Sequence, residues 1–470
     1  MLTRSSPEPL AEQLSARFAE RIRTRLIAPG ARLPSVRECA RQQGVSPATV
    51  VAAYDRLQAA GLVEARRQRG FFARDFQPAG TRSLSDPPAA TSKAAARPAP
   101  IDATTLIRGM FHGASDKPQP GSGVLPAAWL DAPFLGQALR RVTAARAVAH
   151  TLLQYGEPAG DAGLRAALSR RLADLQIPAQ PTQIVTTLGA TQALDIASRA
   201  LLRAGDPVMV DEPGWAVEFA RLSALGYTIL PVPRGPDGPD LAVMQRYCEV
   251  HRPRLYVTVS VLHNPTGYCL GPASAHRVLQ LAVAHDFHIL EDDSYSHFVP
   301  GHATRLSALD GLERTVYVGG FAKLLAPNWR VGFLAAAPSL AERMLDAKLL
   351  ATLTTPALGE KALAWCLEQG LLRRHAERIR ERLGQARQRS ARHVKAAGLR
   401  FAAEPAGLFG WVDLGQDTEA LAQRMLDEGY LIAPGALFHA ERRPSTLMRI
   451  NFAAAQDAGF WEVLARVRKG

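Results

Sequence analysis

The sequence predicts an α/β domain built on a largely parallel sheet and preceded by a small winged helix-turn-helix domain. Three observations support this prediction. Before residue 76, three helical patterns are followed by a short basic hairpin. Residues 77–105 are rich in Pro, Ala, Ser and Thr, lack aromatic residues, and read as a flexible linker that lets the first domain move. From residue 106 to 470, apolar strand candidates alternate with helical patterns.

Composition narrows the class of protein. The 470 residues are 47% hydrophobic and 21% charged, which is typical of soluble globular chains of two or three domains. We expect no membrane span, because no apolar run reaches about 18 residues, and the N-terminus lacks the apolar core of a secretory signal. Four scattered cysteines without a Cys-x-x-Cys pair argue against disulfides or a zinc site and fit a reducing cytoplasm.

Charge is concentrated at the N-terminus. The net charge of the chain is +13, and residues 1–75 hold 13 arginines, no lysine and 7 acidic residues, so this segment carries 13 − 7 = +6. Such a bias suggests a nucleic-acid partner. A generally arginine-rich composition is the alternative.

The first 61 residues predict three helices. Apolar residues recur every fourth position from Leu10 to Leu26 and predict a helix that Pro29 and Gly30 end. Ser35 and Glu38 have the spacing of a capping box that opens a second helix, which Gly44 closes. Ser46 then caps a third helix with Pro47 at its first position, and Gly61 ends that helix.

A β-hairpin follows these helices. Residues 62–65 and 70–73 read as two short strands, and the turn between them contains Arg66, Arg67 and Arg69. A helix in the major groove and a basic hairpin beside it supply the base and phosphate contacts that DNA binding needs. The alternative for the three arginines is an ordinary solvated turn.

The run from Leu33 to Ala40, Leu-Pro-Ser-x-Arg-x-x-Ala, resembles the signature of the GntR family of bacterial regulators. The resemblance covers about 65 residues. It implies that five residues face DNA, namely Ser35, Arg37, Ser46, Ala48 and Thr49. Pro47 stands where many relatives carry an arginine, so base readout at that position is expected to be lost.

Seven strand candidates define the sheet of the second domain, at residues 183–188, 207–210, 228–232, 255–262, 288–291, 315–319 and 331–336. In such folds the site lies at the carboxyl ends of the strands. There, Ala190 and Thr191 open a helix whose N–H groups can bind an anion. Trp215 can stack on a planar cofactor, although plain packing is the commoner role of a tryptophan.

Three further polar residues follow strands in the same way. Asn264 can donate to a phenolate oxygen of a bound ring, and Tyr295 can share it. Asp292 can keep a pyridine nitrogen protonated, which makes the ring an electron sink. The alternative is a metal bound by a carboxylate pair at this strand end, and we expect no metal.

Lys323 is the residue around which this site is organised. It follows an apolar strand and two glycines, and Arg330 follows seven positions later. Desolvation lowers the pKa of a buried lysine and frees its amine to form a Schiff base with a carbonyl. With an arginine to hold a phosphate, this chemistry suggests pyridoxal phosphate (PLP). The alternative is an ordinary surface lysine in a loop.

In this order, the motifs resemble the fold type I PLP-dependent aminotransferases from about residue 106 to 470, with a large part over about 106–385 and a small part over about 386–470. The resemblance implies that Tyr155 reaches the phosphate of a neighbouring subunit and that Arg449 pairs with a substrate α-carboxylate. A structural ion pair is the alternative role of Arg449. Gly320 and Ala322 replace hydroxyl residues that relatives usually carry, so we expect weaker PLP binding than in a housekeeping transaminase.

A winged helix fused to such a body is the arrangement of the MocR group of GntR regulators. This resemblance implies a head-to-tail dimer in which PLP, joined to Lys323 as an internal aldimine, or an amino-compound effector changes binding to promoter DNA, with vitamin B6 or amino-acid metabolism as the expected setting. The second hypothesis is an active aminotransferase with an accessory DNA-binding head. A body that no longer binds PLP is disfavoured by the retained Lys323, Asp292 and Tyr295.

Overall fold

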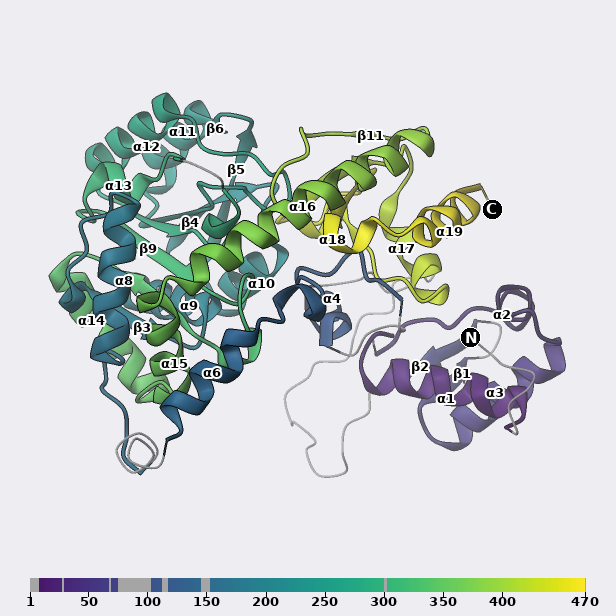
Figure 1. Ribbon diagram of the computed structural model, residues 1–470. Coiled ribbons are helices and arrows are strands. Elements are labelled where there is room, and N and C mark those ends of the chain that lie inside the picture. Colours follow the sequence, from purple (N-terminus) through teal and green to yellow (C-terminus); the bar gives the residue numbers. More distant parts are fainter. Residues whose placement is uncertain are drawn as a thin grey trace, which may run out of the picture.

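The computed structural model describes residues 8–27, 29–66, 69–74, 103–111, 117–144, 153–299 and 302–469. The expected linker therefore lies almost wholly outside the described residues, as does Arg67. The described chain forms an N-terminal unit, called the head, and a larger body in which two sheets are joined by a long helix (Figure 1).

The head contains three helices and a two-stranded wing: α1 (Leu10–Arg23), α2 (Val36–Gln43), α3 (Pro47–Ala59), β1 (Val63–Arg66) and β2 (Gly70–Ala73). Its mostly aliphatic core contains an aromatic cluster, in which the ring of Tyr54 contacts those of Phe18 and Phe71 edge-on. These elements confirm the predicted winged helix-turn-helix fold. Helix α1 stops at Arg23, a turn earlier than the apolar pattern suggested, although Leu26 is still buried.

The predicted capping box at α2 is only half formed. The hydroxyl of Ser35 accepts a hydrogen bond from the backbone N–H of Glu38 at 3.3 Å, as expected. The Glu38 carboxylate does not return to the helix start and instead accepts from Arg41 and Gln42 one turn later. An arginine three positions away offers the carboxylate a charged partner, which outweighs a bond to a backbone N–H.

The large part of the body is an eight-stranded sheet in the order β3-β10-β9-β8-β7-β4-β5-β6. Its strands are β3 (Ile184–Thr187), β4 (Pro207–Glu212), β5 (Thr228–Gly235), β6 (Gly238–Pro239), β7 (Leu255–Thr258), β8 (His288–Asp292), β9 (Thr315–Gly320) and β10 (Gly332–Ala335). All seven predicted strands are present, and β4, β5, β7, β8 and β9 pair in parallel. The hairpin strand β6 was not predicted, and β10 runs antiparallel to both of its neighbours.

Helices cover both faces of this sheet. One apolar cluster joins it to α9 (Ala190–Leu201), α10 (Ala216–Ala224) and α14 (Pro338–Thr352), and another joins it to α11 (Leu241–His251) and α12 (Pro272–His285). A third cluster holds α6 (Pro133–Val142), α8 (Ala162–Asp174) and α15 (Ala357–Glu368). Short helices complete the large part: α5 (Ala127–Leu130), α13 (Leu306–Asp310), η1 (Pro181–Gln183), η2 (Ser296–Phe298) and η3 (Pro327–Trp329).

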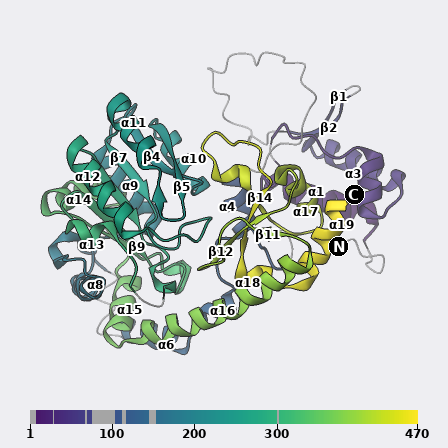
Figure 2. The same cartoon turned by 90° about the horizontal axis from the view of Figure 1, so that it is seen from above.

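The small part of the body is a four-stranded sheet, β11 (Arg400–Phe401), β12 (Phe409–Asp413), β14 (Leu447–Asn451) and β13 (Ala433–Pro434), in that order. It packs with α17 (Thr418–Asp427), η4 (Gly435–Phe438), α18 (Phe452–Ala455) and α19 (Ala458–Lys469). Helix α16 (Leu371–Ala396) runs continuously from one part to the other (Figure 2). Its Leu383 lies in the core of the large part and its Val394 in that of the small part.

Helix α4 (Ala103–Phe111) lies where the parts of the chain meet. Its Leu106 is buried in the apolar cluster of the small part, although α4 precedes the large part in sequence. The chain therefore enters the body at its C-terminal sheet and only then builds the large sheet.

Candidate functional site

Lys323 lies at the centre of the site, in the turn after β9. Its Nζ donates to the backbone oxygen of Gly123 at 2.7 Å. Burial, together with the positive charges of Arg449 and Arg330, lowers the pKa of the Lys323 amine to about 8, although the Asp292 carboxylate opposes the shift. The geometry thus provides an amine that is much easier to deprotonate than an ordinary lysine.

Asp292 ends β8 and faces a hollow between the sheet and α10. The hollow is also lined by Trp215, Glu218 and His263, so the carboxylate and a flat aromatic side chain border the same space. Burial raises the pKa of Asp292 to about 6, hydrogen bonds from the hydroxyl and N–H of Ser294 oppose that rise, and the charge of Glu218 adds to it. A positively charged partner in the hollow would favour the ionised form of Asp292.

Glu218 was missed by the sequence reasoning. It lies in the first turn of α10, three residues after Trp215, is 5% exposed, and forms an ion pair with Arg221. The charge of Glu218 disfavours the ionised form of Asp292, and the ion pair with Arg221 keeps Glu218 itself from being a buried charge without a partner. The spacing from Trp215, which puts both residues at the start of one helix, was the available signal.

Asn264, Tyr295 and Arg449 form a second group beside Lys323. The Asn264 amide donates to the Tyr295 hydroxyl at 3.5 Å, and Arg449 Nη1 donates to Asn264 Oδ1 at 3.1 Å. Arg449 is 2% exposed, its guanidinium lies over the ring of Phe409 at 4.3 Å, and its Nε has no hydrogen-bond partner among the described residues. Burial lowers the pKa of Arg449 to about 10, and burial raises the pKa of Tyr295. Asn264 and Arg449 are therefore placed to bind an anionic ligand from one side.

The expected anion site lies at the start of α9. Ala190 and Thr191 are its first two residues, after Gly189 with φ of 89°. Arg330 donates to the Leu188 oxygen at 2.6 Å, and a Cβ on Gly189 would lie 2.8 Å from Arg330 Nη2. Only glycine fits there, because a side chain would meet the guanidinium and the backbone conformation would be strained. The arginine and the helix N-terminus therefore converge, as phosphate binding requires.

These residues fit PLP as a set. Asp292 and Trp215 border one hollow, Asn264 and Tyr295 are in contact, and Lys323 has the lowered pKa that Schiff-base chemistry needs. The helix start beside Arg330 supplies the phosphate end. One position is tight, because a Cβ on Gly320 would lie 3.3 Å from that of Ala190. A hydroxyl side chain at 320 therefore has little room.

A buried network behind the hollow was also not foreseen. The Asp211 carboxylate accepts from the Tyr256 and Thr258 hydroxyls and from Arg234, and His263 Nε2 lies 3.7 Å from it. Burial lowers the pKa of His263 to about 3, and Arg234 adds to the effect, so the imidazole is neutral. The network fixes the strand ends that carry the site. No sequence motif predicts this network from its polar residues.

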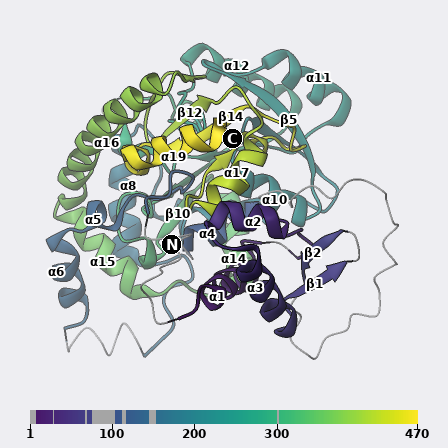
Figure 3. The same cartoon turned by 90° about the vertical axis from the view of Figure 1, so that its right-hand side faces the viewer.

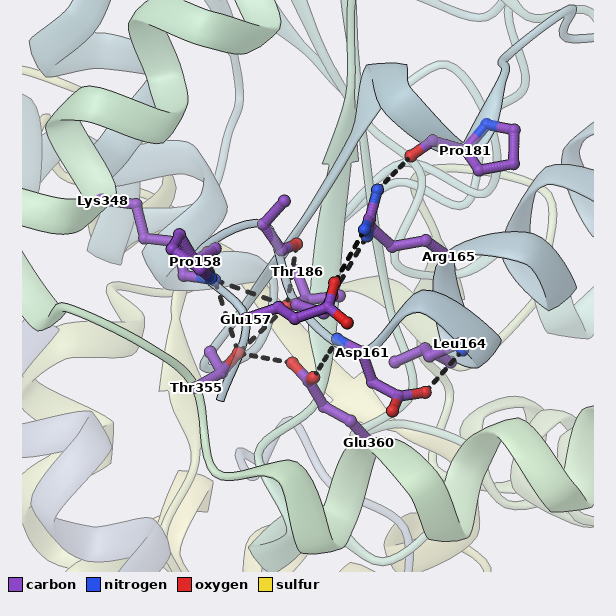
Figure 4. Close-up of polar contacts among 12 residues, drawn as sticks. Glu157, Pro158, Asp161, Leu164, Arg165, Pro181, Thr186, Lys348, Thr355 and Glu360 are labelled. Atoms are coloured by element: carbon purple, nitrogen blue, oxygen red, sulfur yellow. Dashed lines mark hydrogen bonds and ion pairs between the residues drawn. The ribbon is translucent and has the colours of Figure 1, made fainter. Parts of the chain in front are cut away.

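Tyr155 does not reach the site of its own chain, since it is 82% exposed. The segment that follows it is anchored by a buried cluster (Figure 4). Lys348 Nζ donates to the Pro158 oxygen at 2.6 Å, Thr355 donates to Glu360, and the other oxygen of Glu360 accepts from the Asp161 N–H at 2.7 Å. Burial lowers the pKa of Lys348 to about 8, and Glu360 opposes that shift. The exposed side chain of Tyr155 is therefore carried by a segment that this buried cluster holds in place.

In the head, the residues expected to face DNA have mixed environments. Arg37, Ala48 and Arg69 are exposed and available for contact. Ser35 and Ser46 are exposed but cap α2 and α3, and Thr49 donates its N–H to Ser46 at 3.1 Å. Arg66 is paired with Glu64 at 2.6 Å and lies over Phe72. Phosphate contact by Arg66 would therefore compete with that ion pair.

The described residues also bear on metal binding and on membrane insertion. In the part of the chain that the structure describes, no three His, Cys, Asp or Glu side chains are grouped so that they could hold a metal ion. The four cysteines are free, and three of them are buried. Among the described helices, none has both the length and the apolar character needed to cross a membrane.

Comparison with known proteins gives two family matches. Residues 126–467 match aminotransferase class I and II, and residues 10–73 match the bacterial regulatory proteins of the gntR family. The solved structure of LysN, an α-aminoadipate aminotransferase from Thermus thermophilus complexed with N-(5'-phosphopyridoxyl)-L-leucine, superposes with a TM-score of 0.71 at 26% identity. The match covers 78% of this chain and 94% of that one.

Curated relatives fall into two groups. The 2-aminoadipate transaminase of Thermus thermophilus is 29% identical and covers 67% of this chain and 80% of its own. The uncharacterized HTH-type transcriptional regulator YdcR of Escherichia coli is 28% identical over 94% of both chains. The probable rhizopine catabolism regulatory protein MocR of Rhizobium meliloti is 29% identical over 81% of this chain and 76% of its own.

These matches confirm the predicted resemblance to the MocR group and the predicted fold type, and PLP is the cofactor used by fold type I aminotransferases. The GntR domain implies DNA binding, as its sequence predicted. The chain belongs to the class I and II aminotransferase family and carries a GntR-family helix-turn-helix domain at its N-terminal end.

Proposed function

We propose that this protein is a DNA-binding transcriptional regulator that responds to PLP, or to an amino compound bound together with PLP. The observation that carries the proposal is that one chain joins a DNA-binding fold to a body that retains the residues for PLP. Regulators with helix-turn-helix domains match this chain over its head and body alike, whereas the transaminase relatives match mainly the body.

The roles of the residues follow from their positions. Asp292 would hold a proton on the ring nitrogen, Trp215 would stack on the ring, and Asn264 with Tyr295 would bind the ring oxygen. Ala190, Thr191 and Arg330 would bind the phosphate. Bound PLP would supply an aldehyde and an electron-withdrawing ring, and Lys323 would be the amine that holds the aldehyde carbon.

Arg449 supports an effector that carries a carboxylate. Its guanidinium is buried beside Asn264 and Lys323, and its Nε has no partner within the described chain. An arginine with free donors binds a carboxylate through two parallel hydrogen bonds. We therefore infer that the effector, where it differs from PLP, is an amino acid or a similar amino compound.

A dimer is supported by the surface around Tyr155. Leu153, Tyr155, Leu350 and Leu353 are exposed by 77%, 82%, 92% and 54%, and Gly156 lies against the segment that begins at Thr354. A group of large exposed apolar side chains marks an interface. We infer a homodimer through this surface, with Tyr155 directed to the neighbouring phosphate site. In the structure the head contacts the body of its own chain, so the head-to-tail arrangement stays a prediction.

The competing function is transamination. It is favoured by the completeness of the site, since lysine, aspartate, tyrosine and both arginines are all retained. The two functions are separated by two measurements on the same preparation. One is turnover with amino acid and keto acid, and the other is fluorescence anisotropy of a labelled duplex, selected from a random library by the full-length protein, with and without PLP.

A regulator should show a change in DNA affinity on addition of PLP and little turnover. Rapid turnover together with DNA affinity that ignores PLP would favour the enzyme. A protein that shows no visible absorbance band with PLP, or that selects no duplex, would refute the proposed function.

A further inference from the structure

The head rests on the C-terminal end of α17. Arg17 donates to the backbone oxygen of Asp427 at 2.6 Å, and Arg21 donates to the Leu426 oxygen and to the Asp427 carboxylate at 2.8 Å. The last carbonyl groups of a helix lack partners within it and carry the negative end of its dipole. Two arginines one turn apart on α1 therefore cap α17. Arg21 is 6% exposed, so this contact is closed to water. Figure 3 shows the head against this region of the body.

The same helix end is held from the other side by residues 117–124, which we call the strap. Lys117 donates to the Glu428 oxygen at 2.9 Å, and Gln119 donates to the Gly429 oxygen at 3.1 Å. The N–H of Leu431 donates to the Gln119 side chain at 2.6 Å, and the Gly121 N–H donates to the Leu431 oxygen at 2.8 Å. Four successive carbonyl oxygens, 426–429, are thus divided between the head and the strap.

The far end of the strap enters the candidate site. The Gly121 oxygen accepts from Arg449 Nη2 at 2.6 Å, and the Gly123 oxygen accepts from Lys323 Nζ at 2.7 Å. Asn451 fixes the backbone between them by donating to the oxygens of Ser122 and Val124. The strap is close against the body, because a Cβ on Gly121 would lie 2.5 Å from the backbone of Ile432.

A ligand in the site competes with both strap contacts. A carboxylate bound by two bonds takes Nη2 of Arg449 together with a second nitrogen, so it would share Nη2 with the Gly121 oxygen, which already accepts one of the two hydrogens of that nitrogen. Condensation of Lys323 with an aldehyde removes two hydrogens from Nζ as water, so the bond to Gly123 is lost. Ligand binding therefore frees the strap at the end opposite to α17.

A third contact joins the same elements. Gly109 of α4 lies between the head and the helix end, since a Cβ there would be 2.8 Å from the side chain of Leu431 and 3.5 Å from that of Leu26. Leu26 follows α1 and Leu431 follows α17. A shift of the residues after α17 would therefore displace the head through packing contacts as well as through hydrogen bonds.

We propose that residues 426–431 relay the state of the site to the DNA-binding head, with the strap as the moving part. Without ligand, the strap accepts hydrogen bonds from Arg449 and Lys323 and holds the end of α17 in the position in which Arg17 and Arg21 cap it. With ligand, the strap leaves Arg449 and Lys323, the end of α17 relaxes, and the head is released from this contact. This inference rests on the proposed function, because it needs a ligand at Arg449 and Lys323.

The experiment uses the full-length chain with two ligands. PLP has the aldehyde that can condense with Lys323, and N-(5'-phosphopyridoxyl)-L-leucine is a stable compound that has no aldehyde but carries a carboxylate for Arg449. Binding of each ligand is measured by absorbance titration. DNA affinity is measured by anisotropy of the selected duplex, with and without each ligand. The variant is Arg21→Gln, and the matched control is Arg23→Gln, which removes the same charge from an exposed position of the same helix.

In the wild type and in Arg23→Gln we expect each ligand to change DNA affinity by about 5- to 150-fold, the usual range of coupling between two sites. In Arg21→Gln each ligand should bind as tightly as before when no DNA is present, or more tightly, while the change in DNA affinity falls towards onefold. Hydrogen exchange of residues 117–124 and of α1 should rise together when either ligand binds to the wild type.

The outcomes separate the relay from the proposed function. If neither ligand and no DNA binds to the wild type, the proposed function fails. If ligand and DNA bind and Arg21→Gln keeps the full response, or if exchange rises in the strap but not in α1, the relay is wrong while the regulator stands. Should Arg21→Gln misfold, Gly109→Val offers a second test from α4, with the same expected loss of coupling.

Discussion

Capture of PLP by this protein should depend on pH mainly through Lys323 over the range from pH 7 to 10. The pKa of its amine falls from 10.5 to about 8, a difference of 10.5 − 8 = 2.5. At pH 7, about one amine in ten is then neutral, against roughly one in 3,000 for an ordinary lysine, a gain of about 300-fold in the reactive form. The rate should rise tenfold per pH unit below pH 8 and level off above it.

Stopped-flow absorbance after mixing with PLP measures this rate. The same experiment with Nα-acetyl-lysine corrects for the ionisation of PLP itself. Because the charge of Arg449 contributes to the lowered pKa, Arg449→Gln should move the break to higher pH, whereas Arg400→Gln, on the exposed strand β11, should leave it in place. A rate that keeps rising tenfold per unit up to pH 10 in the wild type would show that burial does not lower this pKa.

Four further predictions concern single side chains. Asp292→Asn should weaken PLP binding tenfold or more in an absorbance titration, because a neutral amide cannot hold the ring nitrogen protonated; unchanged affinity would contradict the assigned role. Ala322→Ser should tighten PLP by up to about tenfold if the added hydroxyl reaches the phosphate, and weaker binding would mean that it does not. Lys348→Met should lower the free energy of unfolding in urea by roughly 3 kcal/mol, since it leaves the Pro158 oxygen without its donor and removes a positive charge that interacts with the buried Glu360, while the exposed Lys395→Met should change little; a stabilised Lys348→Met would show that the buried ammonium is a net cost. Arg37→Ala should reduce the slope of log affinity for DNA against log salt by about 0.9, the value for one phosphate contact, and an unchanged slope would place Arg37 away from the backbone.

The sequence was informative where side chains at strand ends carry the chemistry. In a parallel sheet the carboxyl ends of strands lie at one edge, so Asn264, Asp292 and Lys323 could be placed together from their order alone. The capping preference of Ser35 was correct, but the partner of Glu38 was not, because two acceptable partners lie within one turn. Glu218 was missed because it matters through its effect on Asp292, which lies on β8 and is distant in sequence from α10.

The strap could not be predicted in the same way. Its two contacts with the site are made by backbone oxygens, which every residue has, so no residue type marks them. The only local signal is Gly121, whose position leaves no room for a side chain. The linker, expected at residues 77–105, lies almost wholly outside the described residues, and its role remains a proposal. The order of motifs along the chain does not reveal which backbone segment covers the site. Here the covering segment precedes the site residues Lys323 and Arg449 by about 200 to 330 positions.

The strap also gives a physical reason why a regulator could keep the residues of a catalyst. A buried guanidinium and amine without partners would be costly, and the oxygens of Gly121 and Gly123 remove that cost in the free protein. A ligand must then replace two hydrogen bonds to charged groups, each worth about 1.5–3 kcal/mol. It therefore binds more weakly than to an open site, and it can leave again when its concentration falls. Because the bonds that weaken the ligand also hold the strap, and the strap holds the end of α17 through Lys117 and Gln119, the same free energy that is lost in affinity becomes available to move the head. A protein that must report two states on DNA needs both of them to be stable.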